Sequence, residues 1–487
     1  MNKLKVLFVV EKFANMEMLS IPILSAIAKK AGHEVKLLDY SSRTDQKIND
    51  LISWAPDLAA YSICSDQAKE FLKMNLILKE KMNFVSFFGG PHPTFEPKFI
   101  ESEGVDIICR GEGDEAFTEI LKNLHKDSLY DVKNCSFKTK ENKIIENDSA
   151  NLVADLDEFP FPDRDIIYSQ AHHLKNNTVK AFTAARGCPY KCSYCFNHAY
   201  NEMFKGKGRI VRTKSVDYII KEIKIVRDKY PLNFVKFHDD IFGVQRDWLQ
   251  EFAVKYPSEI NLPFICYVNP NMVNEKYAHY LSKAGCSAAI IAIECGNERI
   301  RNEILDRNVS NDQIMYASKT LKKHGIKIYA LNMVGLPTET VEDMISTIKL
   351  NKQAKTDFSD AFVFQPYPGT GLTEYCQKNG FLSEDFDDYS SNMNDSPLNF
   401  SKEFKDKVYI IHKLFLLAIR YPVLLSLIPI ISKMIKLKYT MKSTKNLLKL
   451  INRFSWGFFI RNIYTNKFPL KVLLHGLRTV LFSKDRL

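Results

Sequence analysis

Cys188-Pro189-Tyr190-Lys191-Cys192-Ser193-Tyr194-Cys195 is the stretch that decides the chemistry and the fold of this 487-residue chain. Its three cysteines fall within eight residues. Three thiolates can hold three irons of a [4Fe–4S] cube and leave the fourth iron open, whereas a cluster that only carries electrons usually has four cysteine ligands. The triplet therefore predicts an iron–sulfur cluster that binds a substrate.

The alternative interpretations of the triplet are a zinc site and a disulfide. Zinc sites usually use two pairs of closely spaced cysteine or histidine ligands, and the chain has no second such pair outside the triplet. Disulfides persist in secreted proteins, whereas the apolar opening run Met1–Val10 is too short for a secretory or transmembrane segment and predicts a buried strand. We therefore expect a cytoplasmic chain with reduced thiols. The other cysteines stand singly in apolar stretches, as core thiols do, at Cys64, Cys109, Cys135, Cys266, Cys286, Cys295 and Cys376.

The positive charge of the chain is concentrated in its last part. The net charge is +11, and residues 401–487 hold 18 lysines and arginines against three acidic residues. The 400 residues before them are slightly acidic in balance. Because a nucleic-acid interface needs a basic surface, we expect no nucleic-acid partner for the body of the protein.

Residues 1–125 alternate apolar runs with helix-like patterns, which is typical of βαβ units in a doubly wound parallel α/β sheet. The predicted strands are Val6–Val10, Val35–Leu38, Leu58–Ile63, Phe84–Phe88 and Ile107–Cys109, and the predicted helices are Ile21–Ala31 and Ala68–Met82. His33 is expected to be a solvated loop residue.

Such sheets bind ligands beyond the carboxyl ends of their strands. Small residues there let a ligand approach the backbone. The candidate ligand-binding residues are Ser62, Gly89, Gly90, His92, Thr94, Gly111 and Glu112. The following residues 126–178 are predicted as a linker, with a hairpin over Cys135–Ile145 and a proline-rich end at Phe159–Asp163.

Residues 179–385 contain six apolar runs, each followed by a helical pattern, which predicts a partial (β/α)6 barrel of the TIM type. The predicted strands are Val179–Ala185, Phe234–Phe237, Phe264–Tyr267, Ala289–Ile293, Lys327–Val334 and Ala361–Phe364. The predicted helices are Ser215–Lys229, Arg246–Lys255, Glu275–Ala284, Asn311–His324 and Thr340–Gln353. Functional residues of such barrels gather on the loops after the strands.

Those loops carry a chemically consistent set of residues. The cysteines follow the first strand, and Asp239 and Asp240 follow the second, where a carboxylate could accept hydrogen bonds from an ammonium group. Glu294 follows the fourth strand and could bridge two ribose hydroxyls, and the turn at Gly335 follows the fifth and leaves room for a purine. The alternative for the two aspartates is a helix N-cap.

With Arg186-Gly187 before its first cysteine and Tyr194 before its last, the cysteine loop resembles the signature of the radical S-adenosylmethionine (SAM) enzymes. The resemblance implies that the open iron binds the amino and carboxylate groups of SAM. It further implies that Asp239 or Asp240 holds the amino group, Glu294 contacts the ribose, Arg307 pairs with the carboxylate, and the Gly335 turn and the backbone beside Tyr194 meet the adenine. A solvated helix end is the alternative for Arg307.

The segments Gly89–Thr94 and Gly111–Glu115 resemble the cobalamin-binding domain that precedes the catalytic domain in one branch of this family. Many corrinoid proteins supply a histidine to cobalt from a D-x-H-x-x-G motif after the first strand. The corresponding loop here, Glu11–Met16, has no histidine. We expect cobalamin without a ligand from that loop, and a domain that serves only for packing is the alternative.

The family resemblance implies a 5′-deoxyadenosyl radical that abstracts hydrogen from an unactivated carbon. With methylcobalamin the outcome is C-methylation, and a low-potential donor of the flavodoxin or ferredoxin type would supply the electron. One alternative is a radical enzyme without cobalamin that performs a cyclisation or a rearrangement. Another is a non-catalytic corrinoid or iron–sulfur binding module.

Residues 386–487 are predicted as a basic, largely helical C-terminal region. Leu414–Ser432 carries one charge, at Arg420, and its prolines, Pro422 and Pro429, argue against a transmembrane helix. Apolar residues then recur at helical spacing among lysines, at Leu447, Leu448, Ile451, Phe454, Phe458 and Phe459, which suits an anionic membrane surface. We expect a small-molecule or lipid-like substrate and peripheral attachment to the inner face of the membrane. The alternative is a helical pair that caps the barrel.

Overall fold

The computed structural model describes residues 3–13, 17–384, 386–387, 389, 395–436, 441–460 and 463–464. The chain divides into two compact units. Unit 1 consists of Met1–Asn177 and Ala199–Lys214, and unit 2 consists of Thr178–His198 and Ser215–Leu487.

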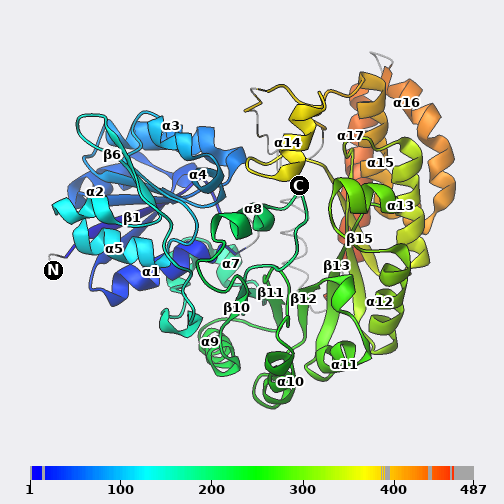
Figure 1. Ribbon diagram of the computed structural model, residues 1–487, viewed down its shortest axis with the longest axis horizontal. Helices are drawn as coiled ribbons and strands as arrows, with labels where there is room; N and C mark the ends of the chain where they lie inside the picture. Colours follow the sequence, from blue (N-terminus) through cyan, green and yellow to red (C-terminus); the bar gives the residue numbers. More distant parts are fainter. Residues whose placement is uncertain are drawn as a thin grey trace. The chain divides into compact units, whose positions relative to one another are not determined.

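Unit 1 is built on a seven-stranded sheet in the order β2-β1-β3-β4-β5-β6-β7. The first five strands pair in parallel, as the doubly wound pattern predicts, and the last two add antiparallel. Figure 1 shows these strands in blue and cyan. Their bounds are β1 Lys5–Val10, β2 Glu34–Asp39, β3 Leu58–Ser62, β4 Val85–Gly89, β5 Ile107–Cys109, β6 Cys135–Lys138 and β7 Ile144–Glu146.

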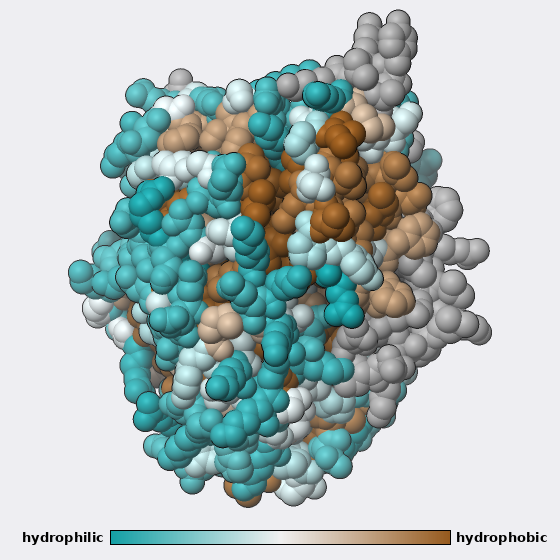
Figure 2. All heavy atoms as spheres, turned by 90° about the vertical axis from the view of Figure 1, so that its right-hand side faces the viewer, coloured by the Kyte–Doolittle hydropathy of each residue, from teal (hydrophilic) through white to brown (hydrophobic). Residues whose placement is uncertain are grey.

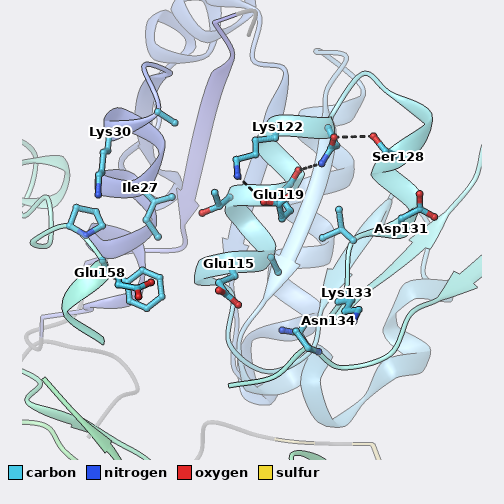
Figure 3. A pocket seen from close by; sticks show the side chains of 18 residues that line it. Ile27, Lys30, Glu115, Glu119, Lys122, Ser128, Asp131, Lys133, Asn134 and Glu158 are labelled. Atoms are coloured by element: carbon cyan, nitrogen blue, oxygen red, sulfur yellow. Dashed lines mark hydrogen bonds and ion pairs between the residues drawn. The ribbon is translucent and has the colours of Figure 1, made fainter. Parts of the chain in front are cut away.

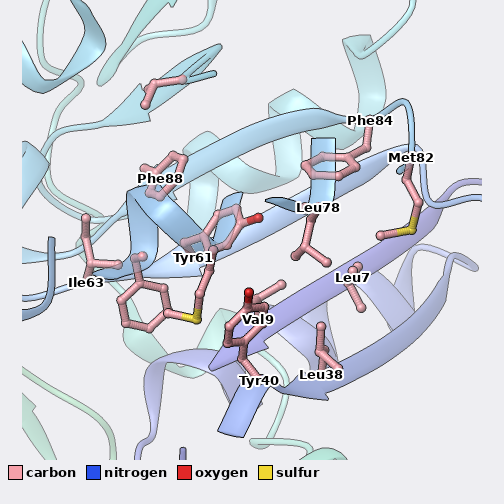
Figure 4. Close-up of a cluster of buried hydrophobic side chains, with 14 of the residues drawn as sticks. Leu7, Val9, Leu38, Tyr40, Tyr61, Ile63, Leu78, Met82, Phe84 and Phe88 are labelled. Atoms are coloured by element: carbon pink, nitrogen blue, oxygen red, sulfur yellow. The ribbon is translucent and has the colours of Figure 1, made fainter. Parts of the chain in front are cut away.

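Helices cover both faces of this sheet. Leu7 and Tyr61 lie on one face and pack against α2 and α3 in a buried cluster (Figure 4). Phe8 and Phe87 lie on the other face, where both rings contact Phe117 of α5. The helices of unit 1 are α1 Ser20–Lys30, α2 Asp45–Trp54, α3 Ala68–Lys79, α4 Pro91–Phe95, α5 Asp114–Asn123, α6 Asp165–Tyr168 and α7 His172–Lys175. Two-faced coverage explains why the strands are almost continuously apolar.

Three details of unit 1 extend or correct the sequence analysis. The hairpin predicted over Cys135–Ile145 forms β6 and β7 and enlarges the sheet. Helix α2 was not predicted, although Thr44 caps it by accepting a hydrogen bond from the Lys47 N–H at 3.3 Å. The prediction for His33 was wrong, because its ring is buried and its Nδ1 accepts a hydrogen bond from the Leu4 N–H at 3.1 Å.

Unit 2 contains a six-stranded sheet in the order β15-β14-β13-β12-β11-β8. All neighbouring strands are parallel and follow one another in the chain, which confirms the partial barrel. The strands are β8 Val179–Phe182, β11 Phe234–Phe237, β12 Phe264–Val268, β13 Cys286–Glu294, β14 Lys327–Val334 and β15 Phe358–Val363. The short strands β9 Ala185–Arg186 and β10 Arg212–Thr213 lie outside this sheet.

The helices of unit 2 that follow the strands are α9 Val216–Lys229, α10 Arg246–Glu259, α11 Glu275–Lys283, α12 Asn311–Lys323, α13 Val341–Gln353 and α14 Gly371–Lys378. Helix α8, Phe196–Met203, spans the point in the sequence where the two units meet. Phe237 and Phe264 point from the sheet toward α10, where they contact Phe252. We call the opposite face, which carries Phe234 and Ile265, the lumen face.

The C-terminal region forms α15 Lys402–Arg420, α16 Ile428–Lys436 and α17 Met441–Phe459. Helix α15 packs against β15 and α13, where Val408 and Ile411 are buried, so this part of the tail belongs to the core of unit 2. Helix α15 ends at Arg420 and Pro422 begins a separate 3-10 turn. Within the described part of the chain, no helix combines the length and the apolar character that crossing a membrane requires. Residues 465–487 of the predicted tail lie outside the described residues.

The end of α17 contributes to the lumen face of the barrel sheet. Ile460 and Ile463 are buried against Phe234 and Ile265, and Trp456 donates a hydrogen bond from Nε1 to Asp360 of β15 at 3.1 Å. The C-terminal segment therefore forms an apolar floor at the end where the strands begin.

Candidate active site

The three cysteines lie in the loop that follows β8 and β9. Cys192 is buried, and Cys188 and Cys195 are partly buried. Ser193 lies between the second and third cysteines, and two backbone hydrogen bonds hold it to other parts of unit 2. Its N–H donates to Leu305 O at 3.0 Å, and its carbonyl accepts from the Leu372 N–H at 2.8 Å. The loop is therefore held in place by the body of unit 2.

Burial raises the pKa of Cys188 to about 12 and that of Cys195 to about 11, since an apolar environment disfavours the thiolate. Within the described residues, no group of three or more His, Cys, Asp or Glu side chains converges on a point where one metal ion would sit. A cube-shaped cluster places a different iron at each thiol, so the triplet does not need to converge. Iron at each sulfur would supply the positive charge that favours the thiolate.

A buried hydrogen-bond chain links Tyr194, Glu294 and Arg307. The Tyr194 hydroxyl donates to Glu294 Oε1 at 2.8 Å and accepts from Arg307 Nη1 at 2.9 Å. Arg307 Nη2 donates to Ala292 O at 2.8 Å, and its Nε is buried without a partner in the described structure. An unsatisfied guanidinium donor is costly, so Arg307 is suited to accept an anionic ligand group.

The two aspartates after β11 do different things. Asp239 is buried, and its Oδ1 accepts hydrogen bonds from the backbone N–H groups of Ala184 at 2.6 Å and Ala185 at 2.7 Å. Asp240 is exposed at the strand end, where its carboxylate accepts hydrogen bonds from Asn197 Nδ2 at 2.8 Å and from the backbone N–H of Gly187. Although the residue reaches the surface, nearby protein atoms shield its carboxylate from part of the solvent, and this desolvation raises the pKa of Asp240. Asp239 therefore braces the start of the cysteine loop, and Asp240 presents a carboxylate to a ligand.

The turn at Gly335 is held by a carboxylate that the sequence analysis missed. Glu339 is buried, and its Oε2 accepts from the N–H groups of Gly335 at 2.6 Å and Leu336 at 3.0 Å. Burial raises the pKa of Glu339 to about 8, although the two N–H groups oppose the rise. The only signal in the sequence was an acidic residue four positions after a glycine.

In unit 1, Ser62 and Gly89 are partners in the parallel register at the carboxyl ends of β3 and β4. A Cβ built on Gly89 would approach no atom closer than 3.9 Å. The Ser62 hydroxyl accepts a hydrogen bond from the exposed Ser20 hydroxyl at 3.2 Å. This strand edge has small side chains, and a Cβ at Gly89 would meet its neighbours only at ordinary van der Waals distance, so a ligand can approach the backbone here.

Other glycines of the predicted cobalamin site contact their own chain instead. A Cβ on Gly90 would lie 2.6 Å from the Ile63 carbonyl, and a Cβ on Gly111 would lie 2.5 Å from the ring of Phe204. Thr94 joins the two loops, since its hydroxyl donates to Gly90 O at 2.7 Å and accepts from Gly111 N–H at 3.0 Å. These residues shape the loops, and Phe204 is a packing partner that the sequence analysis did not find.

His92 and Glu112 also have partners within unit 1. His92 is buried with its Nδ1 at 3.2 Å from the Ser65 hydroxyl, and burial lowers its pKa to about 4. Glu112 forms an ion pair with the buried Arg212, with 2.9 Å between Nη1 and Oε2.

A pocket of about 790 Å³ lies elsewhere in unit 1, along α5 and the end of α1 (Figure 3). It is lined by charges of both signs, including Lys30, Lys133, Glu115 and Glu158. Burial and the neighbouring Glu158 raise the pKa of Glu115. The mixed lining favours no ligand class, and the pocket is separate from the strand edge at Ser62 and Gly89.

Comparison with known protein families agrees with this geometry. The Radical SAM superfamily matches residues 183–350, which include the cysteine loop, and the B12 binding domain matches residues 9–121. The chain is a radical SAM enzyme with a B12 binding domain. The family brings a [4Fe–4S] cluster and SAM as cofactors, and the B12 binding domain brings cobalamin.

The chain is similar to the uncharacterized methyltransferase PH0819 of Pyrococcus horikoshii, with 27% identity over 360 residues that cover 72% of this chain and 76% of the relative. It is 22% identical over 374 residues to the hopanoid C-3 methylase of Methylococcus capsulatus, covering 74% of this chain and 68% of the relative. The solved structure of the cobalamin-dependent SAM radical enzyme OxsB, with aqua-cobalamin and SAM bound, shares the fold at a TM-score of 0.68 and 14% identity, covering 99% of this chain and 84% of that one.

We predict that Asp239→Ala lowers the free energy of unfolding of unit 2 by about 1–3 kcal/mol, because two buried backbone N–H groups lose their acceptor. Asp240→Ala should change it by less than about 1 kcal/mol, because Asp240 is an exposed residue. Urea unfolding followed by tryptophan fluorescence measures both values. Equal losses for the two variants would contradict the assignment of different functions.

Proposed function

We propose that this enzyme transfers a methyl group to an unactivated carbon of its substrate with a cluster, SAM and cobalamin. The observation that carries the proposal is the arrangement at the strand ends of unit 2. The cysteine loop is joined there to Glu294 and Arg307 through Tyr194. When bound, the reduced cluster and SAM supply a 5′-deoxyadenosyl radical, and cobalamin supplies the methyl group.

The residues of unit 2 would bind and orient the reactants. Cys188, Cys192 and Cys195 would hold the cluster. Asp240 would accept hydrogen bonds from the amino group of SAM. Arg307, whose Nε has no partner among the described residues, would pair with the carboxylate. Asp239 is not part of this proposed contact, since it is buried and its Oδ1 already holds two backbone N–H groups.

Glu294 and the Gly335 turn would bind the nucleoside. Glu294 adopts a left-handed φ of 66° at an irregular point of β13, which is costly for a residue with a side chain. The Glu339 carboxylate fixes the turn from behind by holding the Gly335 N–H. In unit 1, the strand edge at Ser62 and Gly89, where the side chains are small, would receive cobalamin.

The test of the function is anaerobic reconstitution with iron, sulfide and hydroxocobalamin, followed by incubation with SAM and a strong reductant. Formation of 5′-deoxyadenosine supports radical chemistry, and cobalamin absorbance retained after desalting supports the second cofactor. Cleavage of SAM by a chain that binds no cobalamin would favour the cyclisation or rearrangement alternative. No cleavage by a chain with a complete cluster would favour a non-catalytic binding module. Reduced flavodoxin and ferredoxin can then be compared as physiological donors.

We expect Cys188→Ala, Cys192→Ala and Cys195→Ala each to lose the charge-transfer absorbance of the cluster and to form no 5′-deoxyadenosine, because each thiolate holds one iron. Cys286→Ala is the matched control, since this thiol is buried at the start of β13, at the opposite end of the strand from Glu294. Iron analysis and absorbance spectra give the readout. An intact cluster in any of the three variants would refute the ligand set.

We expect Gly89→Val to weaken cobalamin binding and to leave SAM cleavage intact. The fold has room for the first carbon of the new side chain, and the branched chain would fill the edge beside Ser62. Equilibrium dialysis with hydroxocobalamin measures the change, and Ile52→Val, at an exposed site on α2, is the control. Unchanged affinity would place cobalamin elsewhere.

The C-terminal helices carry an exposed apolar surface that favours a membrane-borne, lipid-like substrate. Leu447, Leu450, Phe454 and Phe458 form a stripe on α17 in which each side chain is at least 42% exposed. Figure 2 shows the side of the molecule that is on the right in Figure 1, where α16 lies, and apolar side chains gather on this face. Helix α17 also carries lysines and an arginine and has no acidic residue. Apolar and basic groups together suit the surface of an anionic bilayer.

We expect the full-length protein to sediment with vesicles that contain phosphatidylserine and a Leu447→Glu/Phe454→Glu variant to remain in the supernatant. Point variants are preferable to removal of the tail, because α15 belongs to the core of unit 2. Val254→Glu, at an apolar residue of α10 that is 55% exposed, controls for added charge. Equal sedimentation of all three proteins would contradict membrane attachment.

A further inference from the structure

Lys236 places a positive charge on the lumen face of the barrel sheet. It lies in β11 between Val235 and Phe237, whose side chains point toward the outer helices. Strand alternation puts Lys236 on the same face as Phe234, which packs against the apolar floor. Its neighbours in the register are Ala181 of β8 and Ile265 of β12, neither of which is charged.

Among the described residues, Lys236 has neither a hydrogen-bond nor an ion-pair partner. Its side chain is partly buried, and burial alone lowers the pKa of its ammonium group. Asp360, an acidic residue in β15 of the same sheet, instead accepts a hydrogen bond from the indole N–H of Trp456. A charge taken out of water without a counter-charge costs free energy, so this position is unfavourable unless an anion binds there.

Two further polar side chains lie near Lys236. His238 is two residues further along the same extended segment, and its ring centroid lies 6.4 Å from that of Tyr267 in β12. Burial and the charge of Lys236 lower the pKa of His238 to about 4, so its imidazole is neutral at physiological pH. A neutral imidazole and a phenol can each donate one hydrogen bond. Together with the ammonium group they form a set of donors.

The other residues of the lumen face are apolar, and they indicate what kind of group carries the anion. Below the donors lie Ile290, Phe358 and the floor formed by Ile460 and Ile463. A small inorganic anion would leave these apolar groups uncovered, whereas an organic anion could cover them with its carbon skeleton.

We infer that Lys236, His238 and Tyr267 bind the anionic group of the substrate, a carboxylate, phosphate or phosphonate attached to an apolar body. This inference rests on the proposed function, because it identifies the class of substrate that is bound at the same strand ends. Lys236 is then a residue that determines specificity, and the SAM ligands proposed above are separate from it.

The experiment is calorimetric titration of the reconstituted protein with phenylphosphonate, phenylacetate and the neutral phenylacetamide. Wild-type protein should bind both anions more tightly than the amide. Lys236→Met should weaken binding of the anions at least about tenfold, as expected for loss of a charged hydrogen bond, and should not change binding of the amide. Lys236→Arg should restore anion binding. Lys224→Met, which removes an exposed lysine paired with Glu259, should bind like wild type.

Equal binding of the anions to wild type and Lys236→Met, or no binding to wild type, would overturn the inference. Loss of the change that SAM causes in the electron paramagnetic resonance spectrum of the Lys236→Met cluster would also overturn it, because Lys236 would then belong to the SAM site. Formation of 5′-deoxyadenosine by the wild-type protein tests the proposed function separately. If it is formed and the anions do not bind, only the inference about the substrate fails.

Discussion

The hydrogen-bond chain from Arg307 through Tyr194 to Glu294 is the interaction on which the site depends. It connects the cysteine loop, the end of β13 and the segment before α12, which are more than 100 residues apart in the sequence at their widest. All three side chains are buried or partly buried, so removal of any one would leave the others with unsatisfied polar groups. The position of the thiols is thus tied to the position of the residues proposed to bind SAM.

Around this chain, similar residues divide into those that support the site and those that face a ligand. Asp239 and Glu339 use their carboxylates to hold backbone N–H groups, at Ala184 and Ala185 and at Gly335 and Leu336. Asp240 remains exposed. The glycines of unit 1 divide in the same way, because Gly90 and Gly111 leave no room for a Cβ beside their own chain whereas Gly89 would accept one at ordinary van der Waals distance. Rigid support of this kind reduces the reorganisation needed when ligands bind.

The C-terminal region packs on the barrel and also carries an exposed apolar stripe, two features that the sequence analysis presented as alternatives. Helix α15 packs on β15, and the residues after α17 supply the apolar floor of the lumen face, so the region caps the barrel. The stripe on α17 is nevertheless exposed. A helix can do both, because its buried and exposed residues lie on different sides. The floor that closes the lumen and the surface proposed to meet a membrane therefore belong to one structural element.

The sequence by itself determined the class of the two sheets, most of the strands that build them and the cysteine loop. Apolar runs of three to nine residues alternate with helical patterns, and this local periodicity is sufficient to predict both the doubly wound sheet and the partial barrel. The motif Cys188–Cys195 is local as well. Because parallel strands end at one edge, the sequence also predicted correctly that Glu294 and the cysteines lie at the same end of the barrel.

Only the tertiary structure decided which of these residues are available to a ligand. Asp239 and Asp240 are adjacent and chemically identical, and they differ because the Asp239 carboxylate accepts hydrogen bonds from two backbone N–H groups in the segment that follows β8. In the sequence, Lys236 is a single charge in an apolar strand; that it has no partner among the described residues depends on the neighbouring strands, which are distant in the sequence. The contact of Phe204 with Gly111 likewise joins distant segments. Such contacts depend on side-chain packing between elements, which the periodicity of a single segment does not specify.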